Sequence, residues 1–349
     1  MPVLMNRYVA VASAAILGSL LLSAGPAFAD NKIGGGAKGG SPTGGSPTGG
    51  NSKPDGTISA TAGGVVYDRS KNGTGDAVGP VAPTGNWKPP ACWYAPKYTP
   101  EQFKAYVEPI WNAESTGYVW DAQQRDRYVN GHPYTNFNLD KSGKGYWWDS
   151  YVNESFPPGW DSCNKPAFWV DQGAPPPADV PEAVTPEVLA QLAYAEIRVP
   201  TTKVTLRPDG ATKVNLPTWA WLDKADFHPV SVTASVPVLN ISATTTATPV
   251  SLQLEPGTND SVIFPTSGEC PINANGSIGT PYTVGDADKT PPCGVKYLRA
   301  TSTAPYNLKA TVTWKIEWTG TGTNGGKLPD GTFGQNQQVT VQEIQAINR

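Results

Sequence analysis

Alternation of apolar and polar residues dominates the C-terminal half of the chain and predicts β-strands there. The clearest segment is 311–318, TVTWKIEW, in which valine, tryptophan, isoleucine and tryptophan take every second position. Successive side chains of a strand point to opposite faces, so these four side chains share one face. The same alternation marks residues 230–236 and 239–243, and residues 339–347 are expected to add a closing strand. With turn residues between them, these segments predict an antiparallel β-sandwich.

Two segments have helical periodicity, and each begins with threonine, proline and glutamate. In residues 99–101 and 185–187 the threonine hydroxyl can cap a helix, and proline fits the first helical position. Apolar residues then follow at helical spacing as far as Ile110 and Ile197. We expect Pro109 to end or kink the first helix. The second, shorter helix is expected to pack on the strands that follow it.

A turn signal lies at residues 208–210, between two short apolar stretches at 203–206 and 212–216. Its proline presets φ at the second position of a β-turn, and its glycine accepts a positive φ. The sequence therefore predicts a β-hairpin that joins the two stretches.

Composition changes along the chain and predicts its organisation. Residues 34–50, GGGAKGGSPTGGSPTGG, cannot bury apolar surface and predict a flexible tether. Aromatic residues crowd the segment that follows the tether, and the proline-rich run GAPPPADVP follows in turn as a stiff connector. We expect a signal peptide (1–29), a disordered glycine-rich tether (30–86), a small aromatic-rich, disulfide-closed unit of irregular or α+β structure (87–169), a proline-rich linker (170–184), and a short helix followed by the β-sandwich (185–349).

The first 29 residues have the parts of a secretory signal peptide. Arg7 supplies the positive region, residues 8–22 the apolar region, and residues 27–29, AFA, the cleavage site. The apolar stretch is shorter than the roughly 18 residues that a membrane span needs. We therefore expect an extracellular protein, free or associated with the cell wall, with no membrane span after cleavage.

Four cysteines in an exported chain predict two disulfides. Three pairings can be drawn. Their order in the sequence favours Cys92 with Cys163 and Cys270 with Cys293, because each pair then lies within one compositional region. The cysteines lack the close C-x-x-C spacing of zinc sites, so no metal is expected.

Charge and motif content exclude several classes of function. The 26 basic and 29 acidic side chains nearly balance, so no basic field is available for nucleic acid or for an anionic membrane. The two histidines, His132 and His228, offer little for zinc sites or proton relays. Neither a P-loop nor a G-x-S-x-G elbow is present. We expect no cofactor and no catalytic residue of a known motif.

The aromatic-rich segment is the best candidate for a binding surface. Exposed aromatic rings stack on the apolar faces of sugars, so the residues that we single out for glycan binding are Trp120, Tyr146, Trp147 and Trp148. The alternative is that these rings form the core of a small unit that is poor in leucine and isoleucine. A glycan hydrolase would in addition need two paired carboxylates. The spacing selects no pair among Glu108, Glu114, Asp121, Asp126, Asp149 and Glu154.

Three segments carry a resemblance to a known family. Residues 215–222 (NLPTWAWL), 311–318 (TVTWKIEW) and 341–348 (VQEIQAIN) resemble a family of secreted actinobacterial proteins with no assigned activity. The resemblance covers residues 185–349. It implies that the β-rich region is a divergent PKD-type, immunoglobulin-like sandwich.

The chain departs from the family pattern at the positions that could bind a ligand. The acidic turn of PKD domains would fall at residues 252–257, where Gly257 alone matches. Val295 stands where the pattern has a histidine. The resemblance therefore implies an architecture without the ligand chemistry.

Two classes of function follow from these observations. The first is a non-enzymatic scaffold or interaction protein at the cell surface, with another surface protein as its partner. The second is a polysaccharide-binding module or glycan-active hydrolase that uses the aromatic-rich segment on a cell-wall or environmental glycan.

Overall fold

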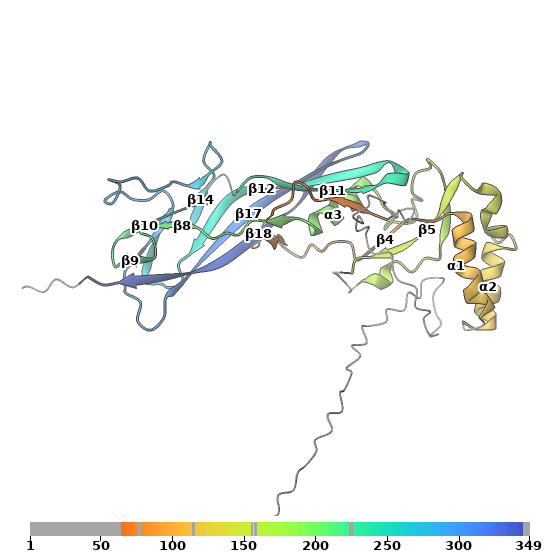
Figure 1. The fold of residues 1–349 in the computed structure, drawn as a ribbon, viewed down its shortest axis with the longest axis horizontal. Coiled ribbons are helices and arrows are strands. Elements are labelled where there is room, and N and C mark those ends of the chain that lie inside the picture. The colour runs from red at the N-terminus through yellow and green to blue at the C-terminus, as the bar shows by residue number, and fades with distance from the viewer. Residues whose placement is uncertain are drawn as a thin grey trace, which may run out of the picture.

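The computed structural model describes residues 64–74, 78–113, 116–154, 156, 159–222 and 227–344. Within them the protein is mainly β. Antiparallel sheets run along most of an elongated molecule, and two helices, α1 (Pro100–Asn112) and α2 (Tyr118–Tyr128), lie at one end (Figure 1). The predicted signal peptide and residues 30–63 of the predicted tether lie outside the described residues.

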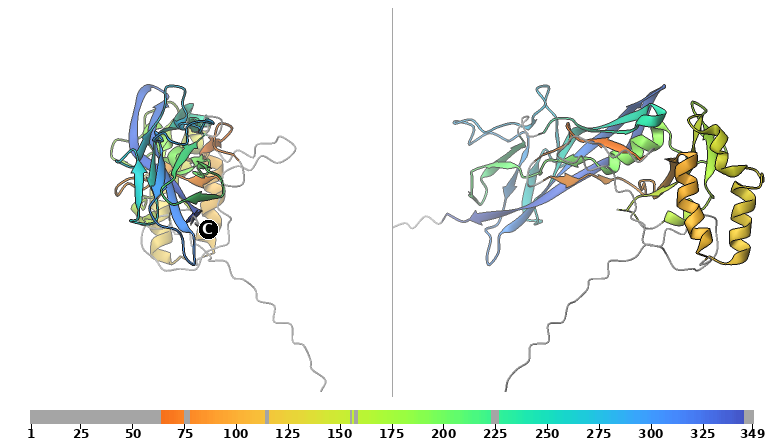
Figure 2. Two further views of the ribbon diagram at one scale, coloured as in Figure 1. Left: turned by 90° about the vertical axis from the view of Figure 1, so that its left-hand side faces the viewer. Right: turned by 45° about the vertical axis from the view of Figure 1, so that its right-hand side comes forward.

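An eight-stranded sheet follows the long axis of the molecule (Figures 1 and 2). Its strands in spatial order are β1 (Val66–Asp68), β11 (Val230–Val236), β12 (Ile241–Glu255), β17 (Tyr306–Gly320), β18 (Thr323–Gln342) and β3 (Ala82–Pro83), with β14 (Glu269–Pro271) beside β12 and β9 (Ala211–Lys213) beside β18. Every pair is antiparallel except β9 with β18. The predicted strand at 230–236 is confirmed as β11, and the predicted closing strand ends earlier than expected, at Gln342.

Strand β17 confirms the alternation predicted at residues 311–318. Val312, Trp314 and Ile316 are fully buried, whereas Trp318 is half-buried. The ring of Trp314 stacks near that of Phe227, with 6.2 Å between the ring centroids. The apolar face of this strand is therefore core.

A second, five-stranded sheet shares its core with the first. Its strands are β13 (Ser261–Phe264), β16 (Gly294–Tyr297), β10 (Pro217–Leu222) and β15 (Ile278–Gly279), with β8 (Thr205–Arg207) also beside β10. Val295 and Tyr297 of this sheet belong to the same continuous apolar cluster as Leu252 and Val312 of the first. The position where the family pattern has a histidine is therefore a buried core position.

The hairpin predicted around residues 208–210 is not formed. Strand β8 pairs with β10, and β9 instead pairs with the end of β18. The Thr212 hydroxyl is buried and lies 2.7 Å from the hydroxyl of Thr218. The chain bends at residues 208–210, but each of the two flanking strands pairs with a distant strand and not with the other.

The helix predicted after residues 185–187 is α3 (Pro186–Ala195). Thr185 caps it by accepting a hydrogen bond from the backbone N–H of Val188, at 3.2 Å. The helix packs on β11, β12 and β17, as expected, and the Thr245 hydroxyl donates to the carbonyl of Ala190 at 2.8 Å. Leu189 of α3 is completely buried.

The proline-rich segment 170–184 packs against the body of the protein instead of spacing two units apart. Val180, Ala183 and Val184 are buried. The backbone of this segment runs beside strand β4 (Cys92–Tyr98), where the Tyr94 N–H donates to the carbonyl of Glu182 and the Val184 N–H donates to the carbonyl of Tyr94. The main apolar cluster therefore runs without a break from the aromatic-rich segment into the sheets.

Residues 64–74 and 78–86 are structured, which corrects the tether boundary predicted at residue 86. They add β1 to one edge of the large sheet and β3 to the opposite edge, and β2 (Gly79–Pro80) pairs with β7 (Arg198–Val199). The side chains of Val65 and Val81 are buried. We call residues 64–74 and 78–86 the strap, because they contribute a strand to each edge of the sheet.

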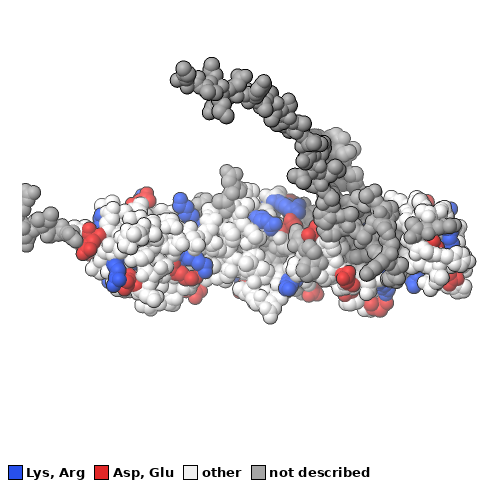
Figure 3. Space-filling model, turned by 90° about the horizontal axis from the view of Figure 1, so that it is seen from below, with Lys and Arg blue, Asp and Glu red and all other residues white. Residues whose placement is uncertain are grey.

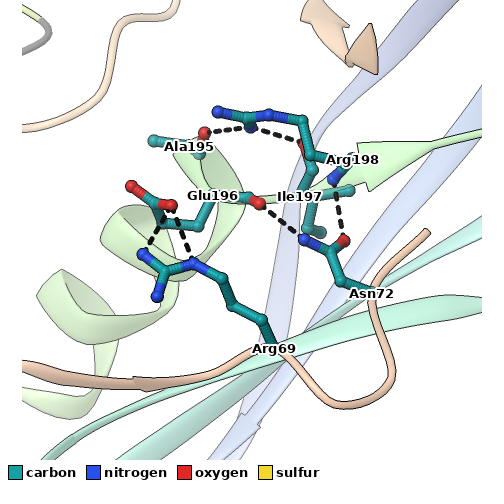
Figure 4. A network of polar contacts seen from close by, with 6 residues as sticks. All are labelled: Arg69, Asn72, Ala195, Glu196, Ile197 and Arg198. Atoms are coloured by element: carbon teal, nitrogen blue, oxygen red, sulfur yellow. Dashed lines mark hydrogen bonds and ion pairs between the residues drawn. The ribbon is translucent and has the colours of Figure 1, made fainter. Parts of the chain in front are cut away.

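A polar network holds the strap at the C-terminal end of α3 (Figure 4). The Arg69 guanidinium contacts the Glu196 carboxylate through two nitrogens, at 3.1 and 2.7 Å. Asn72 donates to the Glu196 carbonyl at 2.9 Å and accepts from the Arg198 N–H at 2.8 Å. These bonds satisfy backbone groups that the end of a helix leaves unpaired.

A three-stranded sheet forms the aromatic-rich segment, in the order β4, β5 (Gly145–Val152), β6 (Phe168–Asp171). Its central strand is covered on both faces, because Trp147 belongs to a separate cluster with α1 and α2 whereas Trp148 belongs to the main cluster. The described 3₁₀ turns are η1 (Asn136–Lys141), η2 (Trp160–Ser162) and η3 (Pro237–Leu239).

Helix α1 confirms the helix predicted from residue 99. Thr99 and Gln102 form a reciprocal capping box. The helix continues past Pro109 for three residues, because Trp111 in the last turn is buried in the cluster shared with Phe103. Proline removes one hydrogen bond here without ending the helix.

The structure contains the two disulfides that the order of the cysteines favoured, Cys92–Cys163 and Cys270–Cys293. The first joins the start of β4 to the residue after η2. The second joins β14 to the start of β16. No described helix is long and apolar enough to cross a membrane.

Candidate functional site

Helix α2 exposes apolar residues and buries polar ones, which is the reverse of an ordinary surface helix. Tyr118 and Val119 are 88% and 69% exposed, whereas Asp121 and Gln124 are 7% and 5% exposed. The helix begins after Gly117, whose φ of 97° is unfavourable for other residues, and its last turn carries Arg125 and Arg127. Basic residues at a helix C-terminus interact favourably with the helix dipole.

Two contacts hold the inner face of α2 in place. Asp121 accepts a hydrogen bond from the Thr116 hydroxyl. Tyr128 is completely buried, donates to the Ala167 carbonyl at 3.0 Å and packs edge-on against Phe103. Burial raises the pKa of the Tyr128 hydroxyl, so it remains a hydrogen-bond donor at neutral pH. Asp121 and Tyr128 thus anchor the inner face without Tyr118 or Val119, whereas the buried Oε1 of Gln124 accepts no hydrogen bond from the described residues.

A hollow of about 680 Å³ lies along α2. The residues that line it are Tyr118, Val119, Trp120, Ala122, Gln123, Gln124, Asp126, Arg127, His132 and Pro166. Most of them come from α2 itself, and His132 comes from the turn that follows the helix. The lining combines aromatic and apolar side chains with amide, carboxylate, guanidinium and imidazole groups.

His132 and Asp126 form a polar pair at this hollow. The Nδ1 atom of His132 lies 3.0 Å from Oδ1 of Asp126, and both side chains are exposed. In a neutral imidazole that donates from Nδ1 to the carboxylate, Nε2 is left as an acceptor. The pair therefore presents hydrogen-bond acceptors beside the aromatic rings.

The four aromatic residues predicted to stack on glycans lie in different environments. Trp120 lines the hollow and is half-buried. Tyr146 is half-buried on β5 and packs against the main cluster. Trp147 and Trp148 are 0% and 1% exposed, so neither ring can offer a face to a sugar.

Burial of Trp147 and Trp148 corrects the expectation that one ring of the adjacent pair is exposed. The Trp147 ring stacks on Phe103 with 4.6 Å between centroids, and its Nε1–H donates to the Phe137 carbonyl at 3.0 Å. Neighbouring residues of a strand face opposite sides. Because both sides of β5 are covered, both rings are core.

Tyr118 and Val119 directly precede Trp120 in the segment GYVWD (117–121), which the sequence indicates as a candidate glycan-binding segment. What the sequence did not show is that the segment begins a helix whose buried residues are Asp121, Gln124 and Tyr128. That burial pattern leaves Tyr118 and Val119 exposed.

The candidate carboxylates do not gather at the hollow. Among those described, Asp126 is the one that lines it. Asp121 and Asp149 are buried, Glu108 contacts Lys104 on the surface of α1, and Glu114 lies outside the described residues. Within the described residues there is also no group of three or more metal-binding side chains.

No family model, curated protein or solved structure matches the chain. The charge distribution gives no single-sign surface on the face shown in Figure 3, where Lys and Arg alternate with Asp and Glu. The hollow beside α2 is therefore identified from its geometry alone.

Proposed function

We propose that the protein is an exported, non-enzymatic interaction protein that receives its partner at the hollow beside α2. The observation that carries this proposal is helix α2, which leaves Tyr118 and Val119 exposed although Asp121 and Tyr128 anchor its inner face. Clustered exposed apolar side chains are typical of binding surfaces. Aromatic side chains are enriched in such surfaces because they contribute a large contact area.

Export is supported by the N-terminal sequence and by the disulfides. Residues 1–29 have the features of a signal peptide, and the four cysteines pair as expected for an oxidising compartment. We further propose that the two sheets with a common core are a divergent PKD or immunoglobulin-like sandwich, as the resemblance of residues 185–349 implies. Helix α2, which lines the hollow, lies with α1 at one end of the molecule, beyond the end of the long sheet (Figure 1).

A polysaccharide is the second candidate, as the partner that occupies the hollow. The Tyr118 ring is exposed for stacking on a sugar, and Gln123, Asp126 and His132 can bond hydroxyl groups beside it. Asp126 is the one described carboxylate in the lining. A hydrolase needs a second one within about 10 Å, so the arrangement favours binding over hydrolysis.

Retention of the full chain on insoluble polysaccharides, together with release of soluble sugar, tests this function. We expect retention without sugar release, and at least a tenfold loss of affinity, about 1.4 kcal/mol, in Tyr118→Ser. Val284→Ser is the matched control, because Val284 is 95% exposed and does not line the hollow.

Each outcome of that experiment discriminates between the candidates. Retention that survives Tyr118→Ser would contradict the α2 hollow as the site. Failure to bind any polysaccharide would contradict the second candidate and leave a protein as the partner. Release of sugar would contradict the non-enzymatic assignment.

A further inference from the structure

A buried ion pair joins the first two strands of the three-stranded sheet. Lys97 on β4 and Asp149 on β5 are only 7% and 3% exposed, and 3.5 Å separates Nζ of the lysine from Oδ2 of the aspartate. Asp149 lies opposite Ala95 in the antiparallel register, so Lys97 is its diagonal neighbour. The two strands, not flexible loops, therefore hold the amine next to the carboxyl group.

Aromatic rings surround the pair. The Lys97 Nζ lies 5.1 Å from the centroid of the Tyr151 ring and 5.8 Å from that of Tyr98. These distances approach the outer limit of about 6 Å for cation–π attraction, so the rings stabilise the ammonium only weakly. Both charged groups are buried in this apolar setting, where an ion pair is costly to desolvate.

We propose that Lys97 and Asp149 condense to form an amide that covalently crosslinks β4 and β5. The driving force is the replacement of two buried charges by one neutral amide, because removing charges from water is costly. The fold already holds Nζ of Lys97 3.5 Å from Oδ2 of Asp149, so the amine and the carboxyl group are brought together before they react. Reducing agents break the Cys92–Cys163 disulfide of the aromatic-rich segment, but they would not break this amide.

The atoms balance without any other reactant. The Lys97 ammonium passes one proton to Oδ2 of Asp149, which leaves a neutral amine and a carboxylic acid. The lone pair of Nζ then forms the bond to Cγ, while an electron pair of the carbonyl moves onto Oδ1. When that pair returns, the bond from Cγ to Oδ2 breaks, and Oδ2 takes a second proton from the nitrogen and leaves as water.

The backbone of Ser150 assists both partners. Its carbonyl accepts a hydrogen bond from Nζ of Lys97 at 2.9 Å, which orients the amine. Its N–H donates to Oδ1 of Asp149 at 2.8 Å. That donor stabilises negative charge on Oδ1 in the tetrahedral intermediate, whereas Oδ2, the oxygen contacted by Nζ, is the one that leaves.

Mass spectrometry of the full chain tests the crosslink. After reduction and denaturation we expect a mass lower by one water than the sequence requires, and no tryptic cleavage after Lys97. The peptides that contain Lys97 and Asp149 should be recovered as one branched species. Lys309 is an internal control, because its contact with Glu255 across β12 and β17 is exposed and should leave it open to trypsin.

The intact mass also depends on where the N-terminus is cleaved. Comparison with Lys97→Arg removes this dependence, because both chains are cleaved at the same position. Arginine keeps the cation but its guanidinium does not act as the nucleophile. We expect the two intact masses to differ by the substitution plus one water. A difference equal to the substitution alone, or cleavage after Lys97 in the native sequence, would overturn the proposal. The peptide map of the native sequence decides the question even if the variant does not fold.

Discussion

At the scale of single residues, burial decides which aromatic side chains are available to a ligand. Trp147 lies among rings contributed by α1, α2 and η1, and its indole N–H bonds to a backbone carbonyl. Tyr118 has no such surroundings and is 88% exposed. Both residues are aromatic, but Trp147 stabilises the fold whereas Tyr118 belongs to the exposed surface.

Replacement of Trp147 by alanine should therefore destabilise the protein strongly. Truncating a buried tryptophan typically costs about 3–5 kcal/mol, and the same range applies to Trp314 in β17. Tyr118→Ala should change the free energy of unfolding by less than about 0.5 kcal/mol. Denaturant unfolding of the three variants checks the ranking. A Trp147→Ala variant as stable as Tyr118→Ala would show that the ring is not core.

At the scale of elements, the strap contacts strands and a helix that are far from it in the sequence. Residues 64–74 and 78–86 contribute one short strand to each edge of the large sheet, and Asn72 bonds to the end of α3. Trp87, which follows the strap, stacks on Tyr194 of α3 with 4.8 Å between centroids. Helix α3 and the large sheet are thus held together by the strap, which lies well before both of them in the sequence.

Truncation at the two ends of the strap should give opposite results. A chain that begins at Gly64 should keep the stability of the longer protein, because every contact of the strap is retained. A chain that begins at Trp87 loses the buried side chains of Val65 and Val81 and should be less stable by at least about 3 kcal/mol. Thermal unfolding of the two truncated proteins measures the difference. Equal melting temperatures would mean that the strap contributes nothing to the fold.

At the scale of the whole molecule, one apolar cluster connects the aromatic-rich segment to both large sheets. The proline-rich segment 170–184 forms part of this cluster. The hollow beside α2 is therefore attached to the long sheet through packed residues and does not swing on a linker.

The free energy of unfolding of the protein should fall in alkaline solution. Burial raises the pKa of six tyrosine hydroxyls, which belong to Tyr67, Tyr94, Tyr128, Tyr151, Tyr194 and Tyr297. Above pH about 10 the unfolded chain releases tyrosine protons that the folded chain retains. Because the unfolded state then binds fewer protons, the free energy of unfolding decreases as the pH rises.

Denaturant unfolding between about pH 8 and pH 11 measures this dependence. We expect a plateau at the lower end and a decline that begins near the ordinary pKa of tyrosine. Tyr128→Phe should reduce the steepness of the decline, since one of the six groups is removed. A free energy of unfolding that stays constant across this range would contradict the prediction.

The sequence by itself determined the features that depend on neighbours along the chain. Thr99 and Thr185 cap helices because a hydroxyl and a proline stand in the right order. The alternation in residues 311–318 specifies which face of β17 is core, since the period of a strand is two. Pairing of each cysteine with its partner in the same region also followed from the order of the residues.

Tertiary structure decided the features that depend on distant partners. The turn at residues 208–210 could not reveal that β8 and β9 pair with different strands. Residues 64–67 resemble a short strand in the sequence, but only the fold shows that this strand joins the edge of the large sheet. The same holds for the site. Whether Trp147 or Tyr118 is exposed depends on which residues cover β5 and α2. Those covering residues come from other segments of the chain. Burial is therefore a property of the fold and not of the local sequence.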